Sequence, residues 1–173
     1  LEKTGIDIAG EASTIIHKQE NVGEVELATM SFGQSFQITP LQMLRAASAI
    51  INGGNLVTPH FAVKSVSEAD GTAVEFNYEI QSNAIEEKTS LMMKDILRQV
   101  VEEGGGKKAY LEGFSIGGKT ATSQKLPRGS GKYISSFIGF SPVDNAKVIA
   151  MCLIDEPQGI YYGGTIAAPV IRE

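Results

Sequence analysis

The sequence predicts an α/β chain of the α+β type, in which helices flank a mainly antiparallel β-sheet. Apolar residues at helical spacing follow a start signal at Thr39-Pro40-Leu41-Gln42. Two β-rich runs, 133–141 and 146–155, meet at a short turn. Because only antiparallel neighbours can be joined so directly, these runs predict a hairpin. With 173 residues and 42% hydrophobic content, the chain can bury the core of one domain.

The N-terminal part is polar and punctuated by glycine up to about Phe36, which predicts an irregular segment with a short helix near 24–30. A helix over 39–51 then has a hydroxyl cap, proline at its first position and glutamine three residues after the cap. Asn52-Gly53-Gly54 ends it. We expect this helix to contribute to the core.

The middle of the chain predicts a hairpin and a second helix. Asp70-Gly71 is a strong turn pair between the β-rich runs 61–66 and 73–78. The second helix opens at Asn83 with a capping-box pattern and ends at Gly104-Gly105-Gly106. Its apolar face, with the methionines as core filler, comprises Met92, Met93, Ile96, Leu97, Val100 and Val101.

The C-terminal part predicts the sheet. Residues 119–122 form an edge strand, and the runs 133–141 and 146–155 form central strands packed on both faces, because the second is continuously apolar. A helix follows from Ile166. Cys152 is predicted to be a buried strand residue without a redox role, since thiols in apolar surroundings are inert.

Composition excludes several classes of function. A net charge of -5 without clustered lysines and arginines argues against nucleic-acid binding. His17 and His60 have no partners at ligand spacing, so neither a metal nor another cofactor is implied. The order of residues in 104–108 is wrong for a phosphate-binding P-loop. No run of ~18 apolar residues occurs, and Leu1-Glu2-Lys3 does not begin a signal peptide.

The most informative motif is Lys119-Thr120-Ala121-Thr122, which follows two glycines. A cation, two hydroxyls and backbone groups on an exposed strand suit a carboxylate and the oxygen of an acyl group under attack. In an extended strand Lys119 and Ala121 share one face, and Thr120 and Thr122 share the other. The plain structural alternative is a solvated edge strand whose lysine discourages aggregation. No Ser-x-x-Lys and no Ser-x-Asn, the motifs that accompany such a strand in penicillin-recognising serine acyltransferases, occurs in the sequence.

Beyond this tetrad, segments along nearly the whole chain, except about 63–103, resemble the C-terminal part of a class B penicillin-binding protein transpeptidase domain. The segments that carry the resemblance besides the tetrad are 4–11 (TGIDIAGE), 27–34 (LATMSFGQ), 38–43 (ITPLQM), 52–54 (NGG), 59–60 (PH), 104–109 (GGGKKA), 137–142 (FIGFSP) and 162–170 (YGGTIAAPV). The resemblance implies that residues 1–173 form the C-terminal portion of that domain and lack its nucleophile-bearing part. The fold class above agrees with it.

The resemblance also implies a function. The intact enzyme would be a serine-type D,D-transpeptidase that cross-links peptidoglycan stem peptides ending in D-Ala-D-Ala and binds β-lactams. Lys119 would be catalytic, while Thr120, Ala121, Thr122 and Ser123 would bind substrate, with half the oxyanion hole from the Thr122 N–H. The chain alone would be inactive. Cell-wall assembly proteins are further implied partners, and the protein would lie on the extracytoplasmic face of the bacterial membrane, held by an N-terminal anchor outside this chain. The Tyr161–Gly164 stretch resembles the family's turn that borders the cleft.

Two departures from the family pattern bear on this interpretation. The literal Lys3-Thr4-Gly5 is rejected as the site because no hairpin follows it. At the favoured site Ala121 replaces the family's glycine, and its β-carbon crowds the approach of substrate. A non-catalytic peptide-groove module or pseudoenzyme in cell-wall assembly therefore remains an alternative function. A β-lactamase is a weaker one, because the segments 31–34 and 38–40 resemble transpeptidases.

Overall fold

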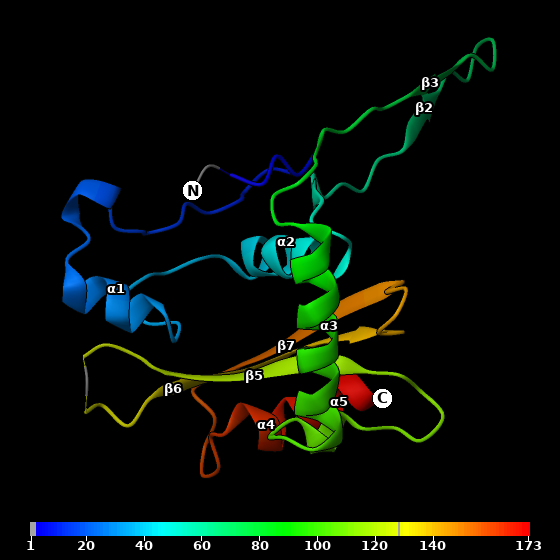
Figure 1. Cartoon of the computed structure of the whole chain (residues 1–173). Coiled ribbons are helices and arrows are strands. Elements are labelled where there is room, and N and C mark those ends of the chain that lie inside the picture. The colour runs from blue at the N-terminus through cyan, green and yellow to red at the C-terminus, as the bar shows by residue number, and fades with distance from the viewer. Residues whose placement is uncertain (1–2, 128) are drawn as a thin grey trace.

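The structure, a computed structural model, describes residues 3–127 and 129–173. Its centre is a three-stranded antiparallel sheet in the order β5-β6-β7, with helices on both faces (Figure 1). The predicted fold class is therefore confirmed. The strands are β5 (Gly117–Gln124), β6 (Tyr133–Ser141) and β7 (Val148–Asp155).

The register of the sheet sets which residues share a face. Phe137 in β6 lies opposite Thr120 in β5 and Cys152 in β7. The predicted hairpin is thus confirmed, and β6 is central. The prediction that β7 is also central was wrong for this chain: within the described residues β7 pairs only with β6, and Val148 is 65% exposed.

Helices α2 (Pro40–Ile51) and α3 (Glu87–Glu102) cover one face of the sheet. At α2 the predicted capping box is present, since the Thr39 hydroxyl accepts a hydrogen bond from the Gln42 N–H at 3.2 Å. The predicted start of α3 at Asn83 was wrong, because Asn83 has a φ of 61° and the helix begins only at Glu87.

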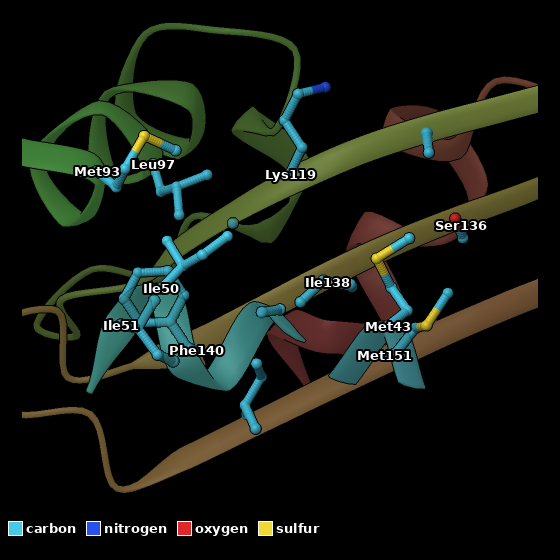
Figure 2. A pocket seen from close by; sticks show the side chains of 14 residues that line it. Met43, Ile50, Ile51, Met93, Leu97, Lys119, Ser136, Ile138, Phe140 and Met151 are labelled. Carbon is cyan, nitrogen blue, oxygen red and sulfur yellow. The ribbon is translucent and has the colours of Figure 1, made fainter. Parts of the chain in front are cut away.

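The predicted apolar face of α3 was correct only in part. Val101 is fully buried and Met93 is half-buried, whereas Met92 and Ile96 are 59% and 50% exposed. Of the two methionines of α3, Met93 is therefore the one that lines the apolar pocket between the helices and the sheet (Figure 2).

The remaining elements of the first half lie before and after α2 in the sequence. The hairpin predicted around Asp70-Gly71 is confirmed, with strands shorter than the β-rich runs, and it projects from the body of the molecule (Figure 1). Asp7 holds the start of this hairpin in place, because the Asp7 carboxylate accepts hydrogen bonds from the N–H groups of Phe61 and Ala62. The other elements here are η1 (Gln19–Asn21), α1 (Glu24–Met30), β1 (Leu56–Val57), β2 (Lys64–Val66), β3 (Ala73–Glu75) and β4 (Ile80–Gln81).

The other face of the sheet is covered by η2 (Lys107–Ala109), α4 (Gly163–Ile166) and α5 (Ala168–Arg172). The main core lies here and includes the fully buried Phe137 together with Val101, which the C-terminal end of α3 contributes, and Cys152 packs against it. The strand position predicted for Cys152 is confirmed, although its side chain is only half-buried. None of the helices in the described part of the chain has the length and apolar character needed to cross a membrane.

Candidate active site

Strand β5 carries the tetrad, and the two glycines before it are required by close packing. A β-carbon on Gly117 would lie 2.4 Å from the Phe140 ring, and one on Gly118 would lie 2.5 Å from the Phe137 ring. The two rings lie on opposite faces, so the start of β5 is clamped between the two layers of the core. The exposed part of the strand begins at Lys119.

On the α2–α3 face, Lys119 and Ala121 border an apolar cavity of about 320 Å³. Figure 2 shows the aliphatic stem of Lys119 leaving β5 with its amine directed away from Met43 and Met151. The Lys119 amine donates a hydrogen bond to the Thr120 carbonyl at 2.8 Å. The cavity is lined by Met43, Ala47, Ile50, Ile51, Met93, Leu97, Gly118, Lys119, Ala121, Ser136, Ile138, Phe140, Ile149 and Met151.

On the opposite face, Thr122 contacts α4. Its Oγ1 accepts a hydrogen bond from the Gly163 N–H at 3.1 Å. A β-carbon on Gly163 would lie 2.3 Å from the carbonyl oxygens of both Ala121 and Ser136, so only glycine permits this approach. Thr120 is half-buried beside the neighbouring Gly164. The alternation of the tetrad between the two faces is therefore confirmed.

The backbone of the tetrad is available at the open edge of the sheet. Ala121 pairs with Ser136, and the carbonyl oxygens of both residues lie close to Gly163, which sits over the two strands. The Ala121 C=O therefore points toward β6. Since neighbouring residues of a strand direct their backbone groups to opposite sides, the N–H and C=O groups of Thr120 and Thr122 point away from β6. The Lys119 amine, from one face, reaches the Thr120 carbonyl at this edge, where Thr122 presents its N–H, and the Thr122 hydroxyl lies on the other face.

These groups suit an anionic ligand that lies along the edge. An ammonium group, a hydroxyl donor and a free N–H can bind a carboxylate or stabilise a developing oxyanion. Ser123 is exposed on the same face as Lys119, whereas Gln124, which lies opposite Tyr133, is half-buried. Among the described residues, no cluster of three or more His, Cys, Asp or Glu side chains could hold a metal ion.

The rejected Lys3-Thr4-Gly5 lies in a different environment. Thr4 is only 2% exposed, and its N–H donates to the Glu11 carboxylate at 2.8 Å. No regular strand includes these residues. Of the two candidate motifs, only the tetrad lies on an open strand edge.

Sequence reasoning missed a set of ion pairs beside the tetrad. Lys125 pairs with Asp155 and Glu156 at 2.9 and 2.8 Å, and Lys132 pairs with Glu156 at 3.0 Å. Hydrogen bonds from Lys125 and then Lys132 lower the pKa of Glu156, and the hydrogen bond with Glu156 raises the pKa of Lys125. The sequence carried a signal only for the two lysines, because extending the β5–β6 pairing past Gln124 brings Lys125 and Lys132 together at the end of the hairpin.

The chain matches known proteins over nearly its whole length. The family described as penicillin binding protein transpeptidase domain matches residues 2–173. Stage V sporulation protein D of Bacillus subtilis is 41% identical over 98% of this chain and 27% of its own length. The probable peptidoglycan D,D-transpeptidase PenA of Neisseria gonorrhoeae is 31% identical over 95% of this chain and 27% of its own length.

Solved structures agree with the sequence relatives. Penicillin binding protein 3 of Mycobacterium tuberculosis, complexed with aztreonam, aligns with a TM-score of 0.86 at 26% identity. The alignment covers 98% of this chain and 41% of that protein. Since this chain spans only about a quarter of the length of its curated relatives, it corresponds to one part of them. The chain belongs to the penicillin-binding protein transpeptidase domain family.

Proposed function

We propose that this chain is the C-terminal portion of the transpeptidase domain of a class B penicillin-binding protein, and that the nucleophile is supplied by a part of the protein outside residues 1–173. The whole protein would cross-link peptidoglycan stem peptides. A serine would attack the D-Ala-D-Ala carbonyl, D-alanine would leave, and an amine of a neighbouring stem peptide would resolve the acyl-enzyme. The same serine would be acylated by β-lactams.

One observation supports this proposal most directly: the tetrad presents a cation, two hydroxyls and unpaired backbone groups along an open strand edge. Lys119, on the cavity side, would stabilise the protonation state of the catalytic groups and the incoming negative charge. Thr120 and Thr122 would bind the substrate carboxylate from the other side. The Thr122 N–H, which points away from β6, would donate one of the two oxyanion-hole hydrogen bonds. Ser123 and Ala121 would line the path of the substrate.

Of the relatives named above, PenA carries this role in its name, as a probable peptidoglycan D,D-transpeptidase, and the aztreonam complex is that of a structural relative with a β-lactam. We further propose that the domain lies on the extracytoplasmic face of a bacterial membrane. An anchor and the cell-wall assembly partners would belong to the rest of the protein.

Labelling with a fluorescent penicillin tests the proposal. The full-length protein should give a band on a denaturing gel that disappears on competition with unlabelled drug. Residues 1–173 alone should give no such band, because an activated nucleophile beside a base is required and no serine here has a lysine three residues later. A competed band from the isolated chain would show that the nucleophile has been misplaced.

A second candidate function is favoured by Ala121. Its β-carbon lies on the same face as Lys119, where the family has glycine, and would crowd a substrate that approaches the strand. A non-catalytic groove that binds peptides during cell-wall or spore-cortex assembly would tolerate this crowding. A full-length protein that binds stem peptide but is never labelled by penicillin would support this candidate and exclude the enzyme.

A further inference from the structure

The segment between β7 and α4, residues 156–162, is attached to the β5–β6 hairpin by charge. The two carboxylate oxygens of Glu156 contact different lysines, Oε1 with Lys125 at 2.8 Å and Oε2 with Lys132 at 3.0 Å. Lys125 and Lys132 also pair through their backbones, at the end of the hairpin. Glu156 therefore bridges both sides of the hairpin end, and about two thirds of its side chain and that of Lys125 is shielded from solvent.

The backbone of Glu156 is fixed as well. Its φ is 48°, in the left-handed region that a residue with a β-carbon rarely adopts. Its N–H donates to the Tyr133 carbonyl at 2.9 Å. An unfavourable backbone conformation persists only where surrounding contacts hold it, and here both the N–H and the carboxylate do so.

Further along, the same segment follows β6 and reaches β5. The Tyr161 ring stacks on the Tyr133 ring with centroids 4.0 Å apart, and the Ser135 hydroxyl donates to the Tyr161 carbonyl. The chain then places the Gly163 N–H on the Oγ1 of Thr122. One continuous set of contacts thus runs from Glu156 to the tetrad.

The last contact determines what the Thr122 hydroxyl can do. A hydroxyl has one hydrogen and two acceptor lone pairs. Because the Gly163 N–H occupies an acceptor position, the side chain is held in one orientation and the hydrogen remains available to donate. Accepting a hydrogen bond also polarises the hydroxyl and strengthens it as a donor. Thr122 is exposed, so this hydrogen can reach a ligand at the strand edge.

We propose that Glu156 is a positioning residue for carboxylate recognition: by bridging Lys125 and Lys132 it seats residues 156–162 on the hairpin and keeps the Gly163 N–H on Thr122, whose hydroxyl then donates to the substrate carboxylate. This inference rests on the proposed function. The bridge also occupies both lysines, so that a substrate carboxylate is not diverted to the hairpin end. The expected defect of a Glu156 variant is therefore selective for ligands that carry a carboxylate.

The test compares two probes on the full-length protein, benzylpenicillin and its methyl ester, which lacks the negative charge. Pre-acylation dissociation constants and acylation rate constants would be measured for wild type, Glu156→Gln, Thr122→Val and their double variant. Glu156→Gln should weaken benzylpenicillin binding by about tenfold, the scale of one hydrogen bond to a charged group, and the ester by less than about twofold. Thr122→Val should show the same selectivity, and the double variant should be no worse than Thr122→Val alone.

Two controls separate positioning from stability. Glu102→Gln removes an ion pair with Arg98 on α3, away from the tetrad, and should change neither probe. Thr122→Ser, which keeps the hydroxyl, should retain most of the benzylpenicillin affinity. Should Glu156→Gln fail to fold, Lys132→Gln removes half of the bridge and should produce the same selectivity in weaker form.

Equal losses for both probes, additive effects of the two substitutions, or tighter benzylpenicillin binding by Glu156→Gln would each overturn the inference. The last result would mean that Lys132, released from Glu156, captures the carboxylate itself, while Lys125 keeps its ion pair with Asp155. A wild-type protein that reacts with neither probe would instead overturn the proposed function and this inference with it. A reactive wild type with an unselective Glu156→Gln variant overturns the inference alone.

Discussion

The two faces of the β5–β6–β7 sheet are packed to very different degrees. On the face covered by α4 and α5, Phe137, Val101 and Ala167 are fully buried in one cluster. On the face covered by α2 and α3, the same strands border an apolar cavity of about 320 Å³. Most of the apolar side chains that line this cavity, such as Ile50 and Met151, are only half-buried, so this face of the sheet is incompletely covered.

This difference in packing separates the two halves of the candidate site, which lie on opposite faces of the sheet. Thr122 lies on the well-packed face, where α4 fixes its hydroxyl, while Lys119 leaves the strand over the cavity. The recognition groups on one side are thus supported entirely from within this chain. On the other side we expect that the proposed nucleophile-bearing helix, from outside residues 1–173, fills the cavity and completes the site.

The largest expected effect separates the two faces by stability. Phe137→Ala should destabilise the chain by about 3–5 kcal/mol, because the ring is fully buried and its removal leaves a cavity in a packed core. Ile138→Ala, one residue away on the face that already borders a cavity, should cost only about 1–2 kcal/mol. Urea unfolding with equal m-values for both variants would measure this. Equal losses would show that the two faces are equally well packed.

The next effect concerns catalysis in the full-length protein. Lys119→Ala should slow acylation by penicillin by roughly a hundredfold, the scale of losing one preorganised electrostatic group. Lys147→Ala is the matched control, since Lys147 is exposed and lies on the turn before β7. Acylation time courses decide the matter. A Lys119→Ala rate close to that of Lys147→Ala would place the site elsewhere.

Local signals in the sequence were enough to predict several elements of the fold. The capping box at Thr39 and the turn pair Asp70-Gly71 act within a few residues, and both were predicted correctly. The start of α3 was not, because a distant contact decides it. The Ala84 N–H donates to the Gly54 carbonyl at 2.8 Å, and Ile85 packs so closely on Gly54 that a β-carbon there would lie 2.0 Å from the Ile85 oxygen. This contact holds residues 84–85 outside the helix.

In the candidate site, too, the local features were predicted and the long-range contacts were not. Alternation along β5 assigned Lys119 and Thr122 to opposite faces, because the strand period is a local property. The Glu156 bridge was missed, since it joins residues about thirty positions apart. Nothing local marks Glu156 as a partner of Lys125. Contacts of this kind become visible only once the register of three strands is known.

A smaller effect is expected from the loosely packed face when residues 1–173 are studied alone. Exposed apolar surface at about 25 cal/mol per Å² favours association, so the chain should bind a hydrophobic dye and form oligomers as its concentration rises. Met151→Gln, on the cavity face, should lower dye fluorescence severalfold, whereas Val170→Ser, on the exposed side of α5, should not. Light scattering over a concentration series measures the oligomers. A monomeric chain that binds no dye would show that the cavity face needs no cover.

The smallest effect concerns Ala121, the position on the cavity face of β5 where the family pattern has glycine. Ala121→Gly in the full-length protein should leave penicillin acylation unchanged or raise it by about twofold to fivefold, because the β-carbon beside the cavity no longer crowds the substrate. The same change should lower stability slightly, by about 0.5–1 kcal/mol, since glycine weakens a strand. Rate and stability thus move in opposite directions, which distinguishes relief of crowding from a general improvement of the fold. Ala73→Gly, on the projecting hairpin, should affect neither acylation nor the cavity face. A tenfold slower Ala121→Gly enzyme would mean that the alanine side chain itself orders the edge of β5 for catalysis.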